Sequence, residues 1–442
     1  MLLGTQRVNE AGHLEIGGCD TIDLAKKFGT PLYVVDEAHI RQNCRNFIAA
    51  FEKRYPKNTI CFAGKSFLTS AMCRIIDEEG LNLDVASLGE LYVAINAGFP
   101  HERINLHGNN KSRAELTMAI ENKIGHIVID NFFEIELLGT ILAELNETVS
   151  VMVRSTPGVD PHTHKFISTG QADTKFGFNI KDGSALKAVE LLLANPAIHF
   201  DGIHCHVGSQ LLDTESHEGA VDAMVGLLVD IKNKTGVICN VLNIGGGLGV
   251  RYRSEHQPPT YEEFAETIIS RLKGKLEAAG LECPVLQQEP GRSIVGEAGT
   301  TLYSVGVVKR VPVKEEPGYR DYVVIDGGLS DNPRPQLYDA VYEIVVANKA
   351  AEPHDITITV AGKHCETDVL IWDVKSTTVV PDDVIAVQTT GAYNYVMASN
   401  YNKFLRPAVV LVNDGVADLI VERETFDDLV KNDRIPERLR KH

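Results

Sequence analysis

Three short stretches of this sequence carry residues that could do chemistry together. Lys65 follows an apolar run and a glycine, and Gly245, Gly246 and Gly247 follow a second apolar run. Glu289 follows a third. A lysine amine can form a Schiff base with a carbonyl group, and glycines let backbone N–H groups approach a phosphate closely. The three stretches could act together only if the fold brings the ends of their strands to one place.

An alternation of strands and helices supplies such a fold. Capping-box patterns at Ser87–Glu90 and Ser112–Glu115 mark helix starts between the strands. Eight strands alternating with helices over about 260 residues predict a (β/α)8 barrel, and the count of eight favours it over a doubly wound open sheet. The expected strands are 59–64, 82–86, 104–107, 126–130, 149–154, 201–207, 240–245 and 285–289.

The carboxyl ends of barrel strands meet at one mouth, and here these ends are polar. The glycines after strand seven fit the phosphate site that barrels commonly build after strands seven and eight. Together with Lys65 they predict pyridoxal phosphate held as a Schiff base, with Glu289 keeping its ring nitrogen protonated. The plainer alternatives are a solvent-exposed lysine and a buried salt bridge between Glu289 and Arg292. The other strand ends are Asp84, His107, Asp130, Arg154 and His204–Ser209.

His204 and His206 stand two residues apart in the expected sixth strand and would share a face. A zinc pair is one interpretation, but the spacing suggests no third ligand, so we predict no metal. A ring stacked on the cofactor is the better use for one of the two histidines.

Composition narrows the class of protein. The 442 residues include 43 Lys and Arg against 60 Asp and Glu, a formal charge of −17, which disfavours a nucleic-acid partner. Eight scattered cysteines form neither a disulfide framework nor a CxxC zinc motif. The sequence shows no leader segment and no run long enough to span a membrane, so we expect a cytoplasmic protein.

After about residue 300 the pattern changes to β-type runs separated by turn residues. We therefore predict a barrel domain over 36–300 and a second, all-β barrel or sandwich domain from 301–442, to which 1–35 would add.

Ordered motifs through most of the chain resemble the meso-diaminopimelate decarboxylase family, whose fold is that of the alanine-racemase-like pyridoxal-phosphate enzymes. Two motifs depart from its usual form: Lys65-Ser66-Phe67 stands for Lys-Ala-Asn/Phe, and Cys365-Glu366-Thr367-Asp368 is one residue shorter than Cys-Glu-Ser-Gly-Asp. The matching motifs are 62–65, 83–90, 107–112, 206–210, 245–249, 289–292, 332–338, 365–366 and 391–393.

The resemblance implies roles for individual residues. Lys65 would hold the cofactor, His206 would stack on its ring and Glu289 would meet its pyridine nitrogen. The family works as a homodimer with shared active sites, so Cys365, a proton donor, and Glu366 would enter the partner's site. The phosphate would bind Ser209, Gly245, Gly246, Gly247, Tyr393 and the loop of Pro290, Gly291 and Arg292.

Substrate choice follows from charge. Diaminopimelate carries a second amino-acid head, and arginine binds a carboxylate with two parallel hydrogen bonds. The resemblance places Arg292, Arg334, Tyr338 and Tyr393 at the substrate and Glu366 at its distal ammonium. We therefore expect decarboxylation of meso-diaminopimelate to L-lysine, the last step of lysine biosynthesis. The alternatives are a same-fold decarboxylase of ornithine, lysine or arginine, a non-catalytic cofactor-binding protein and a zinc-dependent barrel hydrolase.

Overall fold

The computed structural model describes residues 2–159, 173–313 and 318–440. The chain folds as two compact units. The barrel unit comprises Ile40–Gly296, and the β unit combines Met1–His39 with Glu297–His442.

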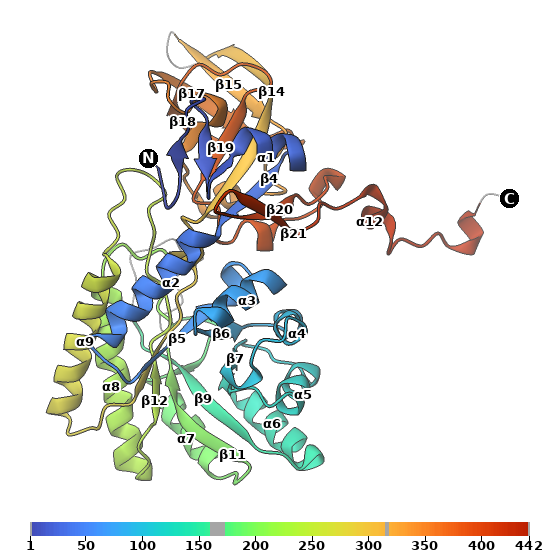
Figure 1. The fold of residues 1–442 in the computed structure, drawn as a ribbon. Helices are drawn as coiled ribbons and strands as arrows, with labels where there is room; N and C mark the ends of the chain where they lie inside the picture. Colours follow the sequence, from blue (N-terminus) through green and yellow to red (C-terminus); the bar gives the residue numbers. More distant parts are fainter. Residues whose placement is uncertain (1, 160–172, 314–317, 441–442) are drawn as a thin grey trace. The chain divides into compact units, whose positions relative to one another are not determined.

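Eight parallel strands of the barrel unit pair in chain order and close on themselves, because β13 pairs with β5 and β8 with β9. The predicted (β/α)8 barrel is thereby confirmed (Figure 1). A short strand, β10 (Phe178–Asn179), pairs in parallel with the carboxyl end of β9. The barrel strands are β5 (Asn58–Ala63), β6 (Asn82–Val85), β7 (Ile104–Leu106), β8 (His126–Ile129), β9 (Val149–Thr156), β11 (Ile198–His204), β12 (Val241–Asn243) and β13 (Val285–Gln288).

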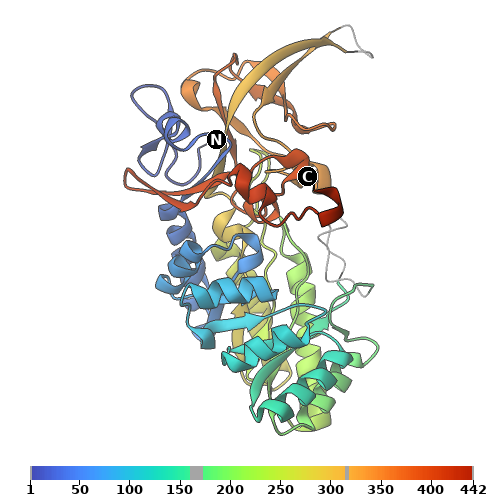
Figure 2. The same ribbon diagram turned by 90° about the vertical axis from the view of Figure 1, so that its right-hand side faces the viewer.

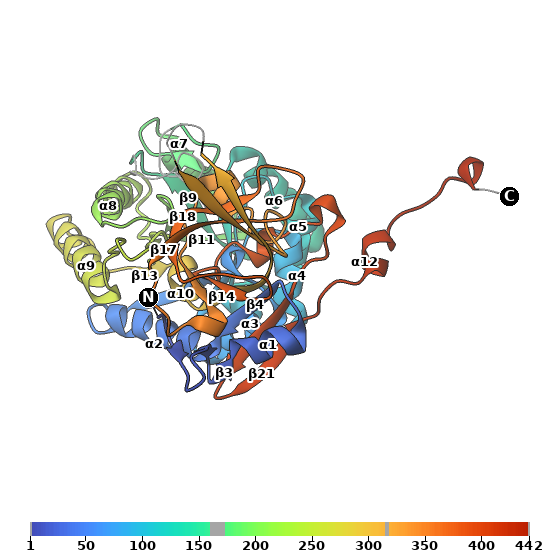
Figure 3. The same ribbon diagram turned by 90° about the horizontal axis from the view of Figure 1, so that it is seen from above.

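Helices surround these strands as a ring in the view of Figure 3. Their inner faces are apolar at helical spacing: α8 buries Val221, Met224, Val225 and Leu228. The helices are α2 (Glu37–Glu52), α3 (Ser70–Glu78), α4 (Leu88–Asn96), α5 (Arg113–Glu121), α6 (Phe132–Leu145), α7 (Ser184–Leu193), α8 (Glu215–Thr235), α9 (Tyr261–Ala278) and α10 (Arg292–Val295).

Only one of the two predicted capping boxes forms completely. At α5 the Ser112 side chain accepts the Glu115 N–H, and the Glu115 carboxylate accepts the Ser112 N–H. At α4 the Ser87 side chain caps the Glu90 N–H, but the Glu90 carboxylate instead accepts the N–H of Ala86 at 2.7 Å. The Ser87–Glu90 motif therefore still starts helix α4, but only one of the two reciprocal hydrogen bonds of a capping box is present.

The β unit is built around the long strand β14 (Gly299–Pro312), whose hairpin with β15 (Tyr319–Ile325) is the curved gold ribbon in Figure 2. The first part of β14 pairs with β4 (Leu32–Asp36) and β19 (Val384–Gln388). The remaining strands of these sheets are β16 (Ile344–Val346), β17 (Ile356–Ala361), β18 (Val369–Ser376), β20 (Ala408–Asn413) and β21 (Val416–Val421).

The first residues of the chain belong to this unit's core. Strands β1 (Arg7–Val8), β2 (Leu14–Ile16) and β3 (Cys19–Asp20) form a small antiparallel sheet before helix α1 (Thr21–Phe28). Leu14, Leu24 and Val34 pack with Leu302 and Val410 in one buried cluster. Short helices α11 (Arg334–Tyr338) and α12 (Phe426–Val430) lie later in the chain. Within the described ranges, no helix has the length and apolar character needed to cross a membrane.

Candidate active site

Lys65 lies in a tight turn that packs against the loop after strand eight. Gly64–Ser66 form one turn of 3₁₀-helix directly after β5, and the Lys65 side chain is exposed. The Ala63 N–H donates to the carbonyl of Pro290 at 3.0 Å, and a Cβ on Gly291 would lie 3.0 Å from the Ser66 hydroxyl. The lysine turn and the Pro290–Gly291 loop therefore pack together, and glycine is needed at 291 for that approach.

His206 lies in the loop after β11, because the strand ends at His204. The expectation that the two histidines share a face of one strand was wrong, because the strand ends at His204, three residues before the end of the predicted strand at residue 207. The Gly246 N–H donates to His206 Nδ1 at 3.3 Å. Burial, and then the charge of Lys65, lower the pKa of His206 well below its usual value. A neutral ring beside Lys65 fits the predicted stacking role.

The glycines after β12 are packed between the ends of strands six and eight. A Cβ on Gly246 would lie 2.1 Å from the carbonyl oxygen of Glu289, so no other residue fits without moving that strand. The Gly245 N–H donates to the Asn243 side chain at 2.8 Å, which fixes the start of the loop. The loop thus presents backbone at the barrel mouth where a phosphate is expected.

Arg292 and Ser209, both predicted to bind ligands, lie in contact. Arg292 is buried and donates from Nε and Nη2 to the Ser209 hydroxyl at 3.3 and 3.1 Å. Its Nη1 also donates to the Tyr252 hydroxyl, a residue that no motif had indicated. Glu289 instead accepts from His204 and Asn243, so the proposed salt bridge between Glu289 and Arg292 does not form.

Glu289 lies at the centre of a buried polar network. Its side chain is 10% exposed, and Oε1 accepts the Asn243 amide N–H at 2.7 Å. His204 Nε2 lies 3.0 and 3.1 Å from the two carboxylate oxygens. Burial would raise the pKa of Glu289, but His204 and His107 outweigh it and hold the pKa well below its usual value. The result is an ionised carboxylate whose Oε1 is more heavily bonded than Oε2.

In the β unit, three predicted substrate residues form one cluster. Arg334 begins α11 and is buried, and its guanidinium carbon lies 5.0 Å from the Tyr338 ring centroid and 5.4 Å from that of Tyr393. A guanidinium held between two aromatic rings keeps a fixed orientation, which suits binding of a carboxylate.

Cys365 and Glu366 lie in an exposed loop whose ends are anchored. His364 Nδ1 contacts Asp368 Oδ2 at 2.5 Å, and both side chains are buried. The Cys365 N–H donates to Asn402 at 3.0 Å, and the Tyr401 hydroxyl donates to the Glu366 carboxylate at 2.5 Å. The shortened motif therefore forms a braced loop that presents the thiol and the acid.

Sequence reasoning missed the partners that hold these residues. Asn243, Tyr252, Tyr401 and Asn402 stand outside the motifs of the residues they contact. Asn243 could have been found, because it is a polar residue at the end of a barrel strand, the position that singled out Lys65.

The barrel residues fit pyridoxal phosphate. An ionised, buried carboxylate suits a protonated ring nitrogen, a neutral imidazole suits a ring face, and the glycine loop with Ser209 and Arg292 suits a phosphate. Lys65 supplies the amine for the carbonyl carbon.

Comparison with known proteins agrees with a pyridoxal-phosphate site in the barrel unit. Residues 37–296 match the family model described as the pyridoxal binding domain of pyridoxal-dependent decarboxylases. The chain is 49% identical to the diaminopimelate decarboxylase of Bacillus subtilis, with 98% of each chain covered. It is 43% identical to that of Mycobacterium tuberculosis, covering 96% of this chain and 95% of the relative. The chain belongs to the diaminopimelate decarboxylase family. Pyridoxal phosphate is accordingly its cofactor.

Solved structures of this family share the fold. Diaminopimelate decarboxylase from M. jannaschii in complex with L-lysine aligns with a TM-score of 0.91 at 36% identity, covering 99% of this chain and all of that one. The Helicobacter pylori enzyme, also complexed with L-lysine, aligns with a TM-score of 0.82 at 30% identity, covering 93% and 98%. A lysine/ornithine decarboxylase from Vibrio vulnificus, at 22% identity and a TM-score of 0.73, shares the fold.

Proposed function

We propose that the protein decarboxylates meso-diaminopimelate at its D-centre, releasing carbon dioxide and L-lysine. The observation that carries the proposal is near-complete alignment with diaminopimelate decarboxylases at up to 49% identity. The Arg334 cluster adds independent support. A second amino-acid head brings a carboxylate that lysine, ornithine and arginine lack as substrates, and a guanidinium held between two tyrosines suits it.

The predicted site residues of the barrel unit each have a role in this reaction. Pyridoxal phosphate, when bound, supplies an electron sink for the pair of electrons left when the carboxylate departs. Lys65 holds the cofactor through its amine, and Glu289 holds the proton of the ring nitrogen. His206, neutral because it is buried, lies against the ring without adding charge. Ser209, the glycine loop and Arg292 bind the phosphate, and Arg292 also contributes to the substrate site.

The β unit completes the chemistry. Net decarboxylation replaces the lost carboxylate with a proton at Cα, and the Cys365 thiol is the group that delivers it. Glu366 binds the distal ammonium while Tyr401 holds its carboxylate in place. Arg334, Tyr338 and Tyr393 bind the distal carboxylate, and Tyr393 also reaches the cofactor phosphate.

We further propose that the protein acts as a homodimer in the cytoplasm, with Cys365 and Glu366 of each copy serving the barrel of the other. Exposed apolar side chains in the β unit support association. Phe426 and Ile435 are 77% and 64% exposed, in a C-terminal segment that extends away from the sheets of its own unit (Figure 1). Sedimentation of the full chain tests the dimer: a monomer that is fully active at all concentrations would contradict it.

The experiment that tests the function compares substrates. The holoenzyme is given the meso, LL and DD stereoisomers of diaminopimelate separately, and carbon dioxide and lysine are both measured. We expect one lysine for each carbon dioxide from the meso isomer alone, and no release from lysine, ornithine or arginine. Faster release from any of those three amino acids would replace the proposal with a same-fold decarboxylase of that substrate.

A further inference from the structure

A second histidine, His107, approaches Glu289 from another side of the barrel. It follows β7, and its Nε2 lies 3.3 Å from Glu289 Oε1 and 3.6 Å from Asp84 Oδ1. The side chains of His107, Asp84 and Glu289 are 10%, 6% and 10% exposed. One ring nitrogen therefore lies within ion-pair distance of two buried carboxylates, a position that favours a proton on that nitrogen and a positive charge on the ring.

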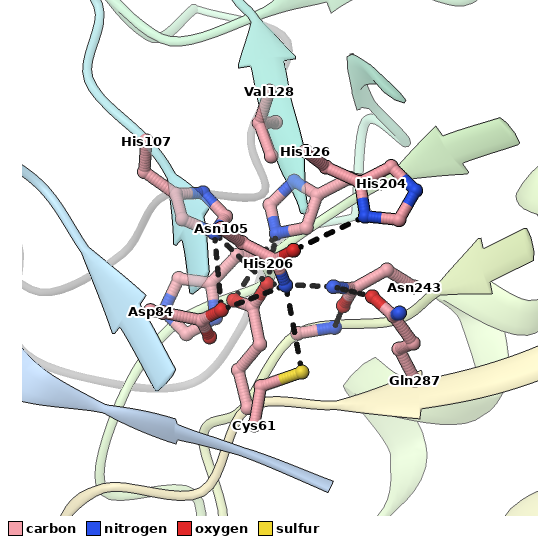
Figure 4. A network of polar contacts seen from close by, with 12 residues as sticks. Cys61, Asp84, Asn105, His107, His126, Val128, His204, His206, Asn243 and Gln287 are labelled. Atoms are coloured by element: carbon pink, nitrogen blue, oxygen red, sulfur yellow. Dashed lines mark hydrogen bonds and ion pairs between the residues drawn. The ribbon is translucent and has the colours of Figure 1, made fainter. Parts of the chain in front are cut away.

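The Asp84 oxygen that faces His107, Oδ1, is also held by a chain of polar groups from neighbouring strands (Figure 4). Asn105 Nδ2 donates to Asp84 Oδ1 at 3.0 Å, and its amide oxygen faces His126 Nδ1 at 3.3 Å. His126 Nε2 in turn lies 3.1 Å from Asp201 Oδ2. The carboxylate of Asp84 is thereby held at His107 by groups from the neighbouring strands.

The two histidines beside Glu289 differ in their surroundings. His204 is 1% exposed and the only carboxylate it faces among the described residues is that of Glu289, and burial lowers its pKa to about 4. Burial would also lower the pKa of His107, but Glu289 and Asp84 outweigh it and raise the pKa to about 9. At neutral pH His204 is a neutral N–H donor, whereas His107 is a cation.

We propose that His107 and Asp84 form a charge-balanced pair that keeps Glu289 ionised toward the cofactor ring, which makes both of them positioning residues. The proposal rests on the assignment of Glu289 to the ring nitrogen. Asp84 offsets part of the His107 charge. The imidazolium therefore does not neutralise Glu289 completely, and the Glu289 carboxylate can still interact with the cofactor ring. The His107 charge in turn prevents the two buried carboxylates from sharing a proton, as closely spaced acids otherwise do.

Other charged and titratable groups around this cluster stay the same in the His107 and Asp84 variants below, and only the His204 control changes one of them. They come from every strand end that packs against it. They are Cys61 and Lys65 at β5, Glu90 of α4, Asp130 after β8, Arg154 of β9, and His204, Cys205 and His206 at β11.

The ligand atoms of His107, His204 and Glu289 lie within 4.8 Å of one another, close enough to bind a metal. A metal would need both histidine nitrogens deprotonated. The carboxylates of Asp84 and Glu289 converge on His107 Nε2 and favour a proton there, so the charge-balanced pair describes the cluster better.

The test uses His107→Gln, which removes the charge and keeps a hydrogen-bonding side chain. The full chain is stripped of cofactor, and the Kd for pyridoxal phosphate is measured at several pH values between 7 and 9. The ratio of variant to wild-type Kd at each pH removes the titration of the cofactor itself. We expect a ratio of about 10 or more at pH 7, falling toward 1 as pH rises. Burial and Glu289 already raise the pKa of Asp84 to about 6, and without His107 the Asp84–Glu289 pair would keep a shared proton to higher pH.

A double variant separates charge from packing. In Asp84→Asn/His107→Gln, Glu289 is the only carboxylate left in the triad and still accepts from Asn243 and His204. We expect the Kd ratio to return toward 1 and to lose its pH dependence, a coupling that independent effects cannot produce. His204→Gln, which exchanges one neutral donor for another, is the matched control, and its effect should not vary with pH.

Two results would overturn the proposal. One is a His107→Gln chain with the wild-type Kd at every pH. The other is a loss of cofactor affinity that does not depend on pH and that is as large or larger in the double variant. That result would mean that His107 has a packing role. If His107→Gln alone does not fold, the double variant is expected to fold and bind cofactor, and its failure would also contradict the proposal. None of these readouts requires diaminopimelate to be the substrate, so they fail separately from the proposed function.

Discussion

The predicted functional groups of the two units differ in their exposure to solvent. In the barrel unit Lys65 is exposed, but the groups around Glu289 are buried and interlocked: the side chains of Glu289 and His204 are 10% and 1% exposed, and each has a polar partner from another strand. In the β unit, Cys365 and Glu366 are exposed, and each is held by one hydrogen bond from a neighbouring loop.

This difference follows from what each set must bind. A cofactor that remains through many turnovers can be surrounded by a dry, low-dielectric network, in which charges act strongly. A substrate that enters and leaves needs groups that solvent can reach. Substitutions of the barrel-unit site residues should therefore change the affinity for the cofactor and its absorption spectrum. Substitutions of Cys365 and Glu366 in the β unit should change kcat or KM and leave the affinity for the cofactor as before.

The largest effect is expected at Lys65. Lys65→Ala removes the amine that holds the cofactor, so activity should fall by at least about 10⁴-fold. The visible absorption of the bound cofactor should also disappear. Lys57→Ala is the matched control, because Lys57 stands just before β5 and its ammonium donates to the Cys283 carbonyl. An active, yellow Lys65→Ala enzyme would refute the central assignment.

The next effect, on kcat alone, is expected at Cys365. Cys365→Ala removes the proposed proton donor and should lower kcat by about 10²–10⁴-fold, the usual range for a general acid. The KM and the Kd for cofactor should stay the same. Cys283→Ala controls for the loss of a thiol, because Cys283 is the other exposed cysteine in the described part of the chain. A Cys365→Ala enzyme that loses its cofactor would break the division between the two sets.

Lys65 and His206 illustrate what the sequence could and could not predict. The barrel followed from periodicity, and Lys65 followed from its place after a strand, because strand ends in this fold share one mouth. His206 was placed one element too early, because the apolar run through Val207 hides the end of β11 at His204. Local pattern does not reveal where a strand leaves the sheet when the following loop is also buried.

The supporting residues needed the folded chain. His107 and Asp84 were visible as strand ends, but their contact with Glu289 joins strands that are distant in sequence. Tyr252 meets Arg292 across 40 residues, and Tyr401 meets Glu366 across 35, without a shared motif. Such pairs arise from packing of loops, which single-sequence periodicity does not encode.

A smaller effect, on KM, is expected at Glu366. Glu366→Gln keeps the shape and removes the charge that would hold the distal ammonium. Loss of a charge-assisted hydrogen bond typically costs about 1.5–3 kcal/mol, so the KM for meso-diaminopimelate should rise by at least about tenfold. Steady-state kinetics with the meso isomer measure this rise. An unchanged KM would mean that Glu366 does not contact the substrate.

The smallest effect is expected at Tyr401, which acts on the substrate only through Glu366. Its ring stacks on His364 with centroids 5.9 Å apart and planes 14° apart, and Tyr401→Phe keeps that ring while removing the hydroxyl. Because the hydroxyl affects the substrate only by orienting the Glu366 carboxylate, we expect part of that bond's energy, about 1 kcal/mol, to reach the substrate, so KM should rise only about three- to fivefold. In the Glu366→Gln background the same change should add little, because the oriented charge is already gone. Additive losses in the double variant would show that Tyr401 has its own contact with the substrate, and a changed Kd for cofactor would show that the exposed set also shapes the buried one.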